Sequence, residues 1–155
     1  MREAGIAGLT ASSPRLRVSA PEFSLAWGTF EAAGVDTKAV PEGDEDALTM
    51  GVEAAHRALS AAGTDGSQVS HLTFATTTPP IAEADLTARL ASILGTPEDV
   101  QTQTVTGSTR AGAQALATAL AAGPWGHGVR LVVVRYHPAP QPGRPPTPPP
   151  AAPAR

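Results

Sequence analysis

VSHLTFATTTPP, which spans Val69 to Pro80, is the stretch that decides the fold. Its first seven residues alternate in polarity and are rich in β-formers, so they predict a strand over 69–75 that runs into a hydroxyl-rich loop. Strand-like stretches also occur over 100–106 and 129–135, and helical patterns separate all three. Strands that alternate with helices predict an α/β fold with a mainly parallel sheet, right-handed crossovers and helices that cover the sheet.

Helical spacing is clearest just before this strand. Over 47–62 the apolar residues recur every three or four positions and Gly63 ends the pattern. The acidic loop 42–46 precedes it, where negative charge favours a helix start. A short apolar run over 5–9 predicts a first strand. Similar reasoning predicts further helices over 21–32, 82–94 and 109–122.

Composition narrows the class of protein. The chain has 155 residues, of which 41% are apolar and 16% are charged, as expected for one folded domain. A net charge of −3 and a pI near 5.7 argue against a nucleic-acid partner, which usually needs a clustered basic face. Residues 1–9 lack the features of a signal peptide, so we expect a cytoplasmic protein. The uncharged run 111–129 is too broken by glycine and proline to span a membrane.

Cysteine is absent from the chain. This absence excludes disulfides, thiolate metal sites and a cysteine nucleophile. The four histidines show no metal-ligand spacing with one another, so no metal site is expected.

Proline marks off the C-terminal tail. Nine of the sixteen prolines lie between Pro138 and Arg155, a segment without Ile, Leu, Val or Phe. Such a segment cannot bury enough surface to fold, so we expect a folded unit over 1–135 and a disordered or polyproline-like tail over 136–155. Two origins are open for the tail. One is a change of reading frame in GC-rich DNA near codon 135, and the other is an authentic proline-rich ligand for an aromatic groove.

Five short motifs, taken in chain order, point to a family. They are GIAG at 5–8, the segment 26–38 with AWG and GVDTK at its ends, DALTM at 46–50, FATTTPP at 74–80 and TGSTRAG at 106–112. Together they resemble the N-terminal half of the thiolase superfamily, in the branch of 3-oxoacyl-[acyl-carrier-protein] synthase III and hydroxymethylglutaryl-CoA synthase. The resemblance implies a layered α-β-α fold with a buried central helix, an acyl-CoA substrate and a Claisen-type acyl transfer.

Two chemical positions of that family are altered here. Family members use a cysteine at the N-terminus of the central helix, where the helix dipole stabilises a thiolate. The resemblance places Thr109 on the cysteine position, with Ser108 as its neighbour, and Thr77 on the position of a glutamate that acts as acid and base. A threonine hydroxyl attacks a thioester only with a positioned base. The resemblance therefore implies a paralogue with changed or lost chemistry, or a subgroup, joined to zinc-ribbon and OB-fold proteins, in which this pattern is natural.

Two further positions resemble CoA ligands near the N-terminus. Trp27 matches the tryptophan that stacks on the CoA adenine, and Lys38 matches a basic residue just beyond it. The helical spacing of Phe23, Trp27 and Phe30 equally fits a stripe of core residues.

Arg110 directly follows the nucleophile position, where the helix dipole disfavours a cation. One interpretation is a ligand for the carboxylate or phosphate of an acyl-CoA. The alternative is a structural ion pair with Glu83 or Asp85, because an unpaired buried charge is costly.

The family's catalytic histidine belongs to a C-terminal half that this sequence lacks. The expected function is therefore that of a truncated fragment of an acyl-CoA condensing enzyme, inactive alone. The alternative is a non-catalytic acyl-CoA-binding or scaffold subunit that partners a complete thiolase-type enzyme, and a third possibility is a small α/β binding domain with a proline-rich ligand tail. An uncovered sheet face predicts association, as a homodimer or with a thiolase-type or zinc-ribbon/OB-fold protein.

Overall fold

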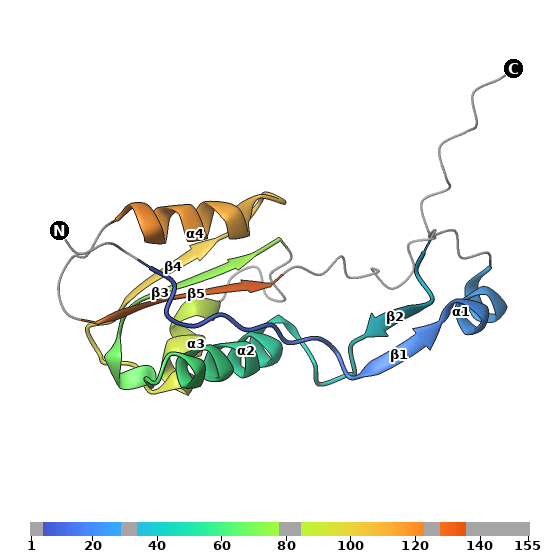
Figure 1. Cartoon of the computed structure of the whole chain (residues 1–155), viewed down its shortest axis with the longest axis horizontal. Helices are drawn as coiled ribbons and strands as arrows, with labels where there is room; N and C mark the ends of the chain where they lie inside the picture. Colours follow the sequence, from blue (N-terminus) through green and yellow to red (C-terminus); the bar gives the residue numbers. More distant parts are fainter. Residues whose placement is uncertain (1–4, 29–33, 78–84, 123–127, 136–155) are drawn as a thin grey trace, which may run out of the picture.

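A three-stranded parallel sheet forms the centre of the fold. The computed structural model describes residues 5–28, 34–77, 85–122 and 128–135 (Figure 1). The sheet consists of β3 (Val69–Thr76), β4 (Gln101–Val105) and β5 (Val129–Arg135), in the order β4-β3-β5. Both pairs of neighbours are parallel. The parallel sheet that the sequence predicts is therefore confirmed.

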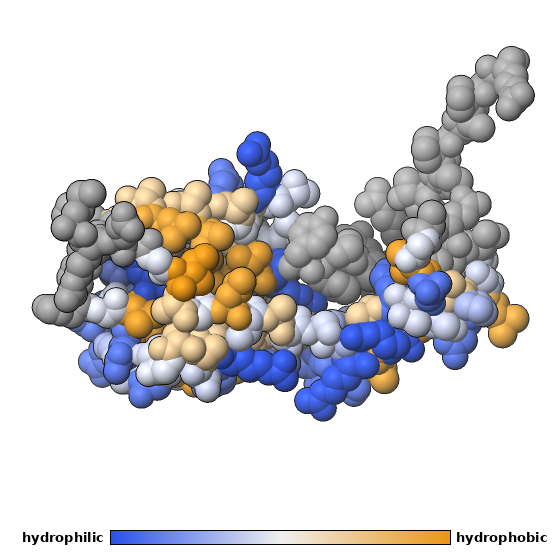
Figure 2. All heavy atoms as spheres, in the orientation of Figure 1, coloured by the Kyte–Doolittle hydropathy of each residue, from blue (hydrophilic) through white to orange (hydrophobic). Residues whose placement is uncertain are grey.

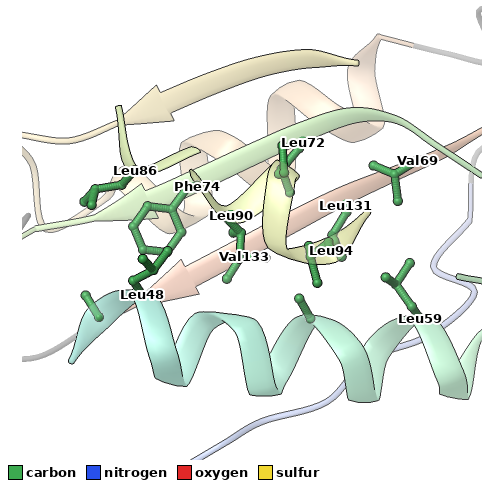
Figure 3. Close-up of a cluster of buried hydrophobic side chains, with 13 residues drawn as sticks. Leu48, Leu59, Val69, Leu72, Phe74, Leu86, Leu90, Leu94, Leu131 and Val133 are labelled. Carbon is green, nitrogen blue, oxygen red and sulfur yellow. The ribbon is translucent and has the colours of Figure 1, made fainter. Parts of the chain in front are cut away.

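Two helices, α2 (Ala47–Ala61) and α3 (Leu86–Leu94), cover one face of this sheet (Figure 1). Their buried side chains join those of β3 and β5 in one core. Figure 3 shows Phe74 and Leu72 of β3 among leucines of both helices and of β5. Full burial of one such side chain contributes about 1.5–3 kcal/mol, so this cluster is the main source of stability in the described fold.

A single helix, α4 (Ala111–Ala121), covers the opposite face, which gives three α-β-α layers (Figure 1). Its side facing the sheet is made of small residues, and buried Ala111 packs in one cluster with Ala75 of β3. Leu116 and Leu120 of the same helix line a groove beside β5 and are 41% and 40% exposed.

Aspartates cap the helices that start at the carboxyl end of the sheet. Asp46 Oδ1 accepts the backbone N–H groups of Leu48 and Thr49, each at 2.8 Å. In return, Thr49 Oγ1 accepts the Asp46 N–H at 2.9 Å, which completes a capping box. Asp85 caps α3 through its side chain, which accepts the backbone N–H groups of Thr87 and Ala88. The acidic loop predicted to favour a helix start thus supplies the α2 cap.

A hairpin unit precedes α2 and is built from β1 (Leu16–Ser19), α1 (Ala20–Trp27) and β2 (Thr37–Val40). The two strands are antiparallel and form their own sheet. Figure 1 shows this unit extending beyond the end of the central sheet. The sequence predicts only its helix, because each strand has just four residues and shows no clear alternation.

The strand predicted over 5–9 is wrong. The segment has no regular structure and lies along α2, where Thr10 Oγ1 donates to the Ala54 carbonyl at 3.0 Å. Ser12 Oγ donates to Glu53 Oε2 at 2.6 Å. Within the described ranges, no strand pairs with this segment, because β5 is bonded to β3 alone. An apolar run without a ladder partner cannot form a strand.

The boundaries of four other elements were predicted well. The predicted ends of α2, β3, β4 and β5 all lie within one residue of the observed ones. The helix predicted over 21–32 ends early at Trp27, because Gly28 follows it with φ +94°. The helix predicted from residue 82 starts at Leu86, after its cap, and residues 82–84 lie outside the described ranges, as does the predicted tail 136–155.

Candidate functional site

The carboxyl ends of the three strands form one edge of the sheet. Ala75 of β3 lies opposite Val105 of β4 and opposite Val134 of β5. Thr77 follows β3, and the Ser108-Thr109 pair follows β4, so the register brings these candidates to the same edge. Parallel sheets bind ligands outside the carboxyl ends of their strands, which makes this edge the candidate site.

The turn between β4 and α4 fixes where the hydroxyl groups lie. Gly107 adopts φ +82°, a backbone conformation that glycine accepts at little cost. Ser108 Oγ then accepts the Arg110 N–H at 3.1 Å, and the Ser108 carbonyl accepts the Ala111 N–H, also at 3.1 Å. This bonding holds Arg110 at the N-cap with non-helical geometry. The helix predicted over 109–122 is therefore corrected to one that starts at Ala111, two residues after Thr109.

Neither hydroxyl of this turn contacts a base among the described residues. Thr109 is exposed, and Ser108 is half-buried with its Oγ engaged by the Arg110 N–H. Thr77 is half-buried at the end of β3. The arrangement supplies hydroxyl groups and the start of a helix, which can hold the oxygens of a ligand, and within the described ranges it supplies no group that would deprotonate a hydroxyl.

Arg110 is exposed, and its positive charge favours the binding of an anion at this site. Within the described ranges it forms no ion pair, and Asp85, one of its two expected partners, accepts the N–H groups of Thr87 and Ala88 instead, each at 3.0 Å. The other expected partner, Glu83, lies outside the described residues. A solvent-accessible guanidinium at the sheet edge is available to a carboxylate or phosphate.

The two CoA-ligand candidates of the N-terminal part lie on the hairpin unit. Lys38 is exposed on β2, opposite Val18 of β1. Trp27 is the last residue of α1, and its side chain lies outside what the structure describes. The structure thus brings together Thr77, Ser108, Thr109 and Arg110 at the sheet edge and leaves Lys38 on the separate unit.

Arg135, at the end of β5, belongs to the same edge, although the sequence analysis did not select it. It is the register partner of Thr76 on β3. Its Nη1 is buried without a hydrogen-bond partner among the described residues. Burial lowers the pKa of this guanidinium below its ordinary value, and the charges of Asp46 and Glu45 act against that shift. The available signal in the sequence was an arginine that directly follows the apolar run 131–134.

No group of three or more His, Cys, Asp or Glu residues within the described ranges is placed to hold a metal ion. No described helix has both the length and the apolar content needed to cross a membrane.

Comparison with known sequences finds relatives among the hydroxymethylglutaryl-CoA synthases, although no family model matches the chain. A hydroxymethylglutaryl-CoA synthase of Thermococcus gammatolerans is 38% identical over 119 residues, which cover 77% of this chain and 34% of the synthase. The synthase of Thermococcus onnurineus is 35% identical over 120 residues, with the same shares covered. The chain therefore spans about a third of the length of the curated relatives it matches.

Solved structures with similar folds include a priming β-ketosynthase from a polyketide biosynthetic pathway. It matches with a TM-score of 0.78 and 26% identity, over 87% of this chain and 42% of that chain. OleA of Xanthomonas campestris, solved with bound lauric acid and lauroyl-CoA, matches with a TM-score of 0.67 and 18% identity, over 75% of this chain and 38% of that chain. Both matches agree with the α-β-α layers described above.

Proposed function

We propose that this chain is the acyl-CoA-recognising part of a condensing acyltransferase and does not transfer acyl groups on its own. The chain carries the N-terminal half of a thiolase-like fold and is homologous to part of the hydroxymethylglutaryl-CoA synthases. The observation that carries the proposal is the sheet edge where Thr77 and the Ser108-Thr109 pair follow two neighbouring strands. Hydroxyl groups beside a helix start suit the polar atoms of a thioester.

The lack of a competent nucleophile among the described residues supports the proposal that the chain does not transfer acyl groups on its own. The family's cysteine position is held by Thr109, and a hydroxyl titrates far above a thiol. Activation would require a base in hydrogen-bond contact, and among the described residues Ser108 Oγ is instead engaged by the Arg110 N–H. At the family's glutamate position, Thr77 has no carboxylate to offer.

Two exposed cationic side chains support the recognition of CoA. Arg110 at the sheet edge and Lys38 on the hairpin are both exposed, and CoA carries several phosphate oxygens that such side chains bind. OleA, a protein of similar fold, was solved with lauroyl-CoA bound. We therefore assign the substrate class as acyl-CoA, with Trp27 as a further candidate for stacking on the adenine.

A non-catalytic acyl-CoA-binding or scaffold subunit of a complete thiolase-type enzyme is the second candidate function. The observation that favours it is the set of exposed apolar side chains on α4 and β5, among them Leu116, Leu120 and Val134. Apolar groups of this kind mark a protein contact more often than a free surface.

Calorimetric titration with acetyl-CoA, combined with a free-thiol assay on the same samples, tests the proposal. We expect binding heat without release of CoA thiol, and roughly tenfold weaker binding for Arg110→Ala, because a charge-assisted bond to phosphate is lost. Arg57→Ala, which removes a guanidinium from the middle of α2, serves as the matched control and should bind as the wild type does. No binding at millimolar acetyl-CoA would contradict recognition, and thiol release above the uncatalysed rate would contradict inactivity.

A further inference from the structure

The sheet face beneath α4 changes from apolar to polar along the strands. At the carboxyl end, Ala75 of β3 and Val105 of β4 pack with buried alanines of α4. Figure 2 shows apolar side chains gathered between α4 and α2, the region in which Figure 1 places β5. At the amino end, the residues that meet α4 include His71 of β3 and Arg130 of β5, which are register partners. Polar side chains in a helix–sheet contact need hydrogen-bond partners, which makes this end a candidate ligand site.

A cavity of about 80 Å³ lies at this amino end, between the last turns of α4 and the three strands. Its polar lining residues come from all four elements: His71, Thr73, Gln103, Thr118 and Arg130. A water molecule takes up about 30 Å³ in the liquid, so the cavity has room for about two or three waters or for one ion of about five heavy atoms. A nucleotide or a CoA molecule is too large for it.

The charge of this cavity favours an anion. Its four wall elements contain no Asp or Glu, and the acids that precede β3 and β4, Asp65 and Asp99, do not line it. Half-buried Arg130 donates from Nη1 to the Ala119 carbonyl of α4 at 3.0 Å. The carbonyl end of a helix carries about half an elementary negative charge, which the full charge of a guanidinium exceeds. A guanidinium has five N–H donors, so one carbonyl does not saturate it.

His71 determines which anion fits. Its Nδ1 lies 3.1 Å from Ser70 Oγ, and Ser70 Oγ donates to the Val129 carbonyl at 3.4 Å. Because the hydroxyl proton of Ser70 is used in that bond, its Oγ accepts from Nδ1–H, and the neutral ring keeps Nε2 as an acceptor. Hydrogen phosphate has a hydroxyl group to donate to such an acceptor, whereas sulfate has none at neutral pH.

We propose that this cavity binds one hydrogen phosphate ion, with Arg130 donating to its charged oxygens and His71 Nε2 accepting from its hydroxyl group. The hydroxyl of Thr73, on the same strand as His71, supplies a further hydrogen bond. A phosphate monoester offers the same chemistry but adds an organic group that exceeds the volume of the cavity. The cavity lies at the opposite end of the strands from the proposed CoA edge, so phosphate binding and acyl-CoA recognition can each fail without the other.

NMR of the histidine rings in the full chain tests this proposal, with inorganic phosphate as the probe at fixed pH and ionic strength. The signals of His71 report the cavity alone, and those of His56, exposed on α2, are the internal control. Sulfate and glycerol phosphate are titrated in the same way. Arg130→Gln removes the charge from the cavity, and Arg57→Gln removes the same charge from the surface of α2. Thr73→Val removes one hydroxyl and no charge, so it keeps the test valid if Arg130→Gln does not fold.

We expect the His71 signals to shift saturably with millimolar phosphate while the His56 signals stay in place. Arg130→Gln should weaken phosphate binding roughly tenfold, because a charge-assisted bond is lost, and Arg57→Gln should leave it unchanged. Thr73→Val should weaken it severalfold. Sulfate and glycerol phosphate should bind more weakly than phosphate does. Equal shifts at His56 and His71, equal binding of sulfate, tighter binding of glycerol phosphate, or unchanged affinity in the cavity variants would each overturn the proposal.

Discussion

A Cβ atom built on Gly8 would lie 2.5 Å from the carbonyl oxygen of Ala58, so the N-terminal segment lies directly against the backbone of α2. Two side-chain hydrogen bonds further along, from Thr10 and Ser12, hold the segment in place. The segment forms one wall of the groove beside β5.

Gly8→Ala should therefore detach the segment. The added methyl group overlaps backbone atoms that cannot move alone, and an overpacked contact of this kind costs about 1–3 kcal/mol. We expect faster hydrogen exchange over residues 6–12 while the sheet keeps its protection. Gly5→Ala is the matched control, because nothing lies within 4 Å of a Cβ at Gly5. Equal exchange in the two variants would show that the segment does not rest on α2.

Attachment of the segment should also depend on pH through Glu53. The hydrogen bond from the Ser12 hydroxyl is the largest cause that holds the pKa of Glu53 below its ordinary value of 4.5, and the charges of Arg57 and Arg15 add to it. A carboxyl whose pKa is lower in the folded state stabilises that state above its unfolded pKa, and this stabilisation is lost as pH falls through the folded pKa. Protection of residues 6–12 should thus decline as the solution is acidified below about pH 4.5.

Ser12→Ala checks the cause of that shift. The pKa of Glu53, followed by NMR titration of its carboxyl carbon, should rise toward the ordinary value. Glu22 serves as an internal control, because the backbone N–H and side chain of Ser19 lower its pKa at another place. A Glu53 pKa that does not change in Ser12→Ala would assign the shift to the arginines.

Thr87 should be the polar side chain on which the packing of α3 depends. It is fully buried, its Oγ1 lies 2.5 Å from Oγ1 of Thr104, and it also donates to the Gln103 carbonyl at 3.3 Å. Thr87→Val keeps the shape and leaves these groups without partners, so the free energy of unfolding should fall by about 1–3 kcal/mol in urea denaturation. Thr87→Ser, which keeps the hydroxyl, should recover most of the hydrogen-bond part of that loss. Equal stability of the two variants would contradict a role for the hydroxyl.

Asp46 should matter for stability more than its acidic neighbours do. It caps α2 through two N–H groups, so Asp46→Ala should lower the free energy of unfolding by about 0.5–2 kcal/mol. Asp44→Ala is a suitable control, because only the backbone carbonyl of Asp44 takes part in the described bonding, as acceptor for Thr49 Oγ1. Equal losses at the two positions would mean that the net charge of the loop matters and the cap does not.

The parts of the fold that sequence predicts well are those in which one periodic signal decides. In α2 the apolar spacing, the acidic cap and the closing glycine all agree, and β5 contains the apolar run 131–134. The apolar run at 5–9 was predicted as a strand and is not one. A strand needs a neighbouring strand to pair with, and the spacing of residues does not show whether such a partner is present. The early end of α1 depended on the backbone angle of Gly28, which sequence alone does not fix.

The candidate site likewise contains residues that were selected from the sequence and residues that were missed. Thr77, Ser108 and Thr109 were selected through the resemblance to the family, and the register then shows that they follow parallel strands that end at a common edge. The true start of α4 was missed because Ser108 Oγ accepts the Arg110 N–H in the turn before the helix, and the sequence does not show which of the neighbouring hydroxyls forms this bond. Arg135 was missed because its importance lies in burial without a partner, which no residue pattern encodes.

Native mass spectrometry of the chain with acetyl-CoA tests the central claim most directly, because one spectrum reports both binding and acylation. We expect a one-to-one complex in the native spectrum and an unmodified chain after denaturation. Absence of the complex would contradict acyl-CoA recognition. An acetyl group that survives denaturation on Ser108 or Thr109 would show that a hydroxyl of this edge acts as a nucleophile, and would contradict the claim that the chain does not transfer acyl groups on its own.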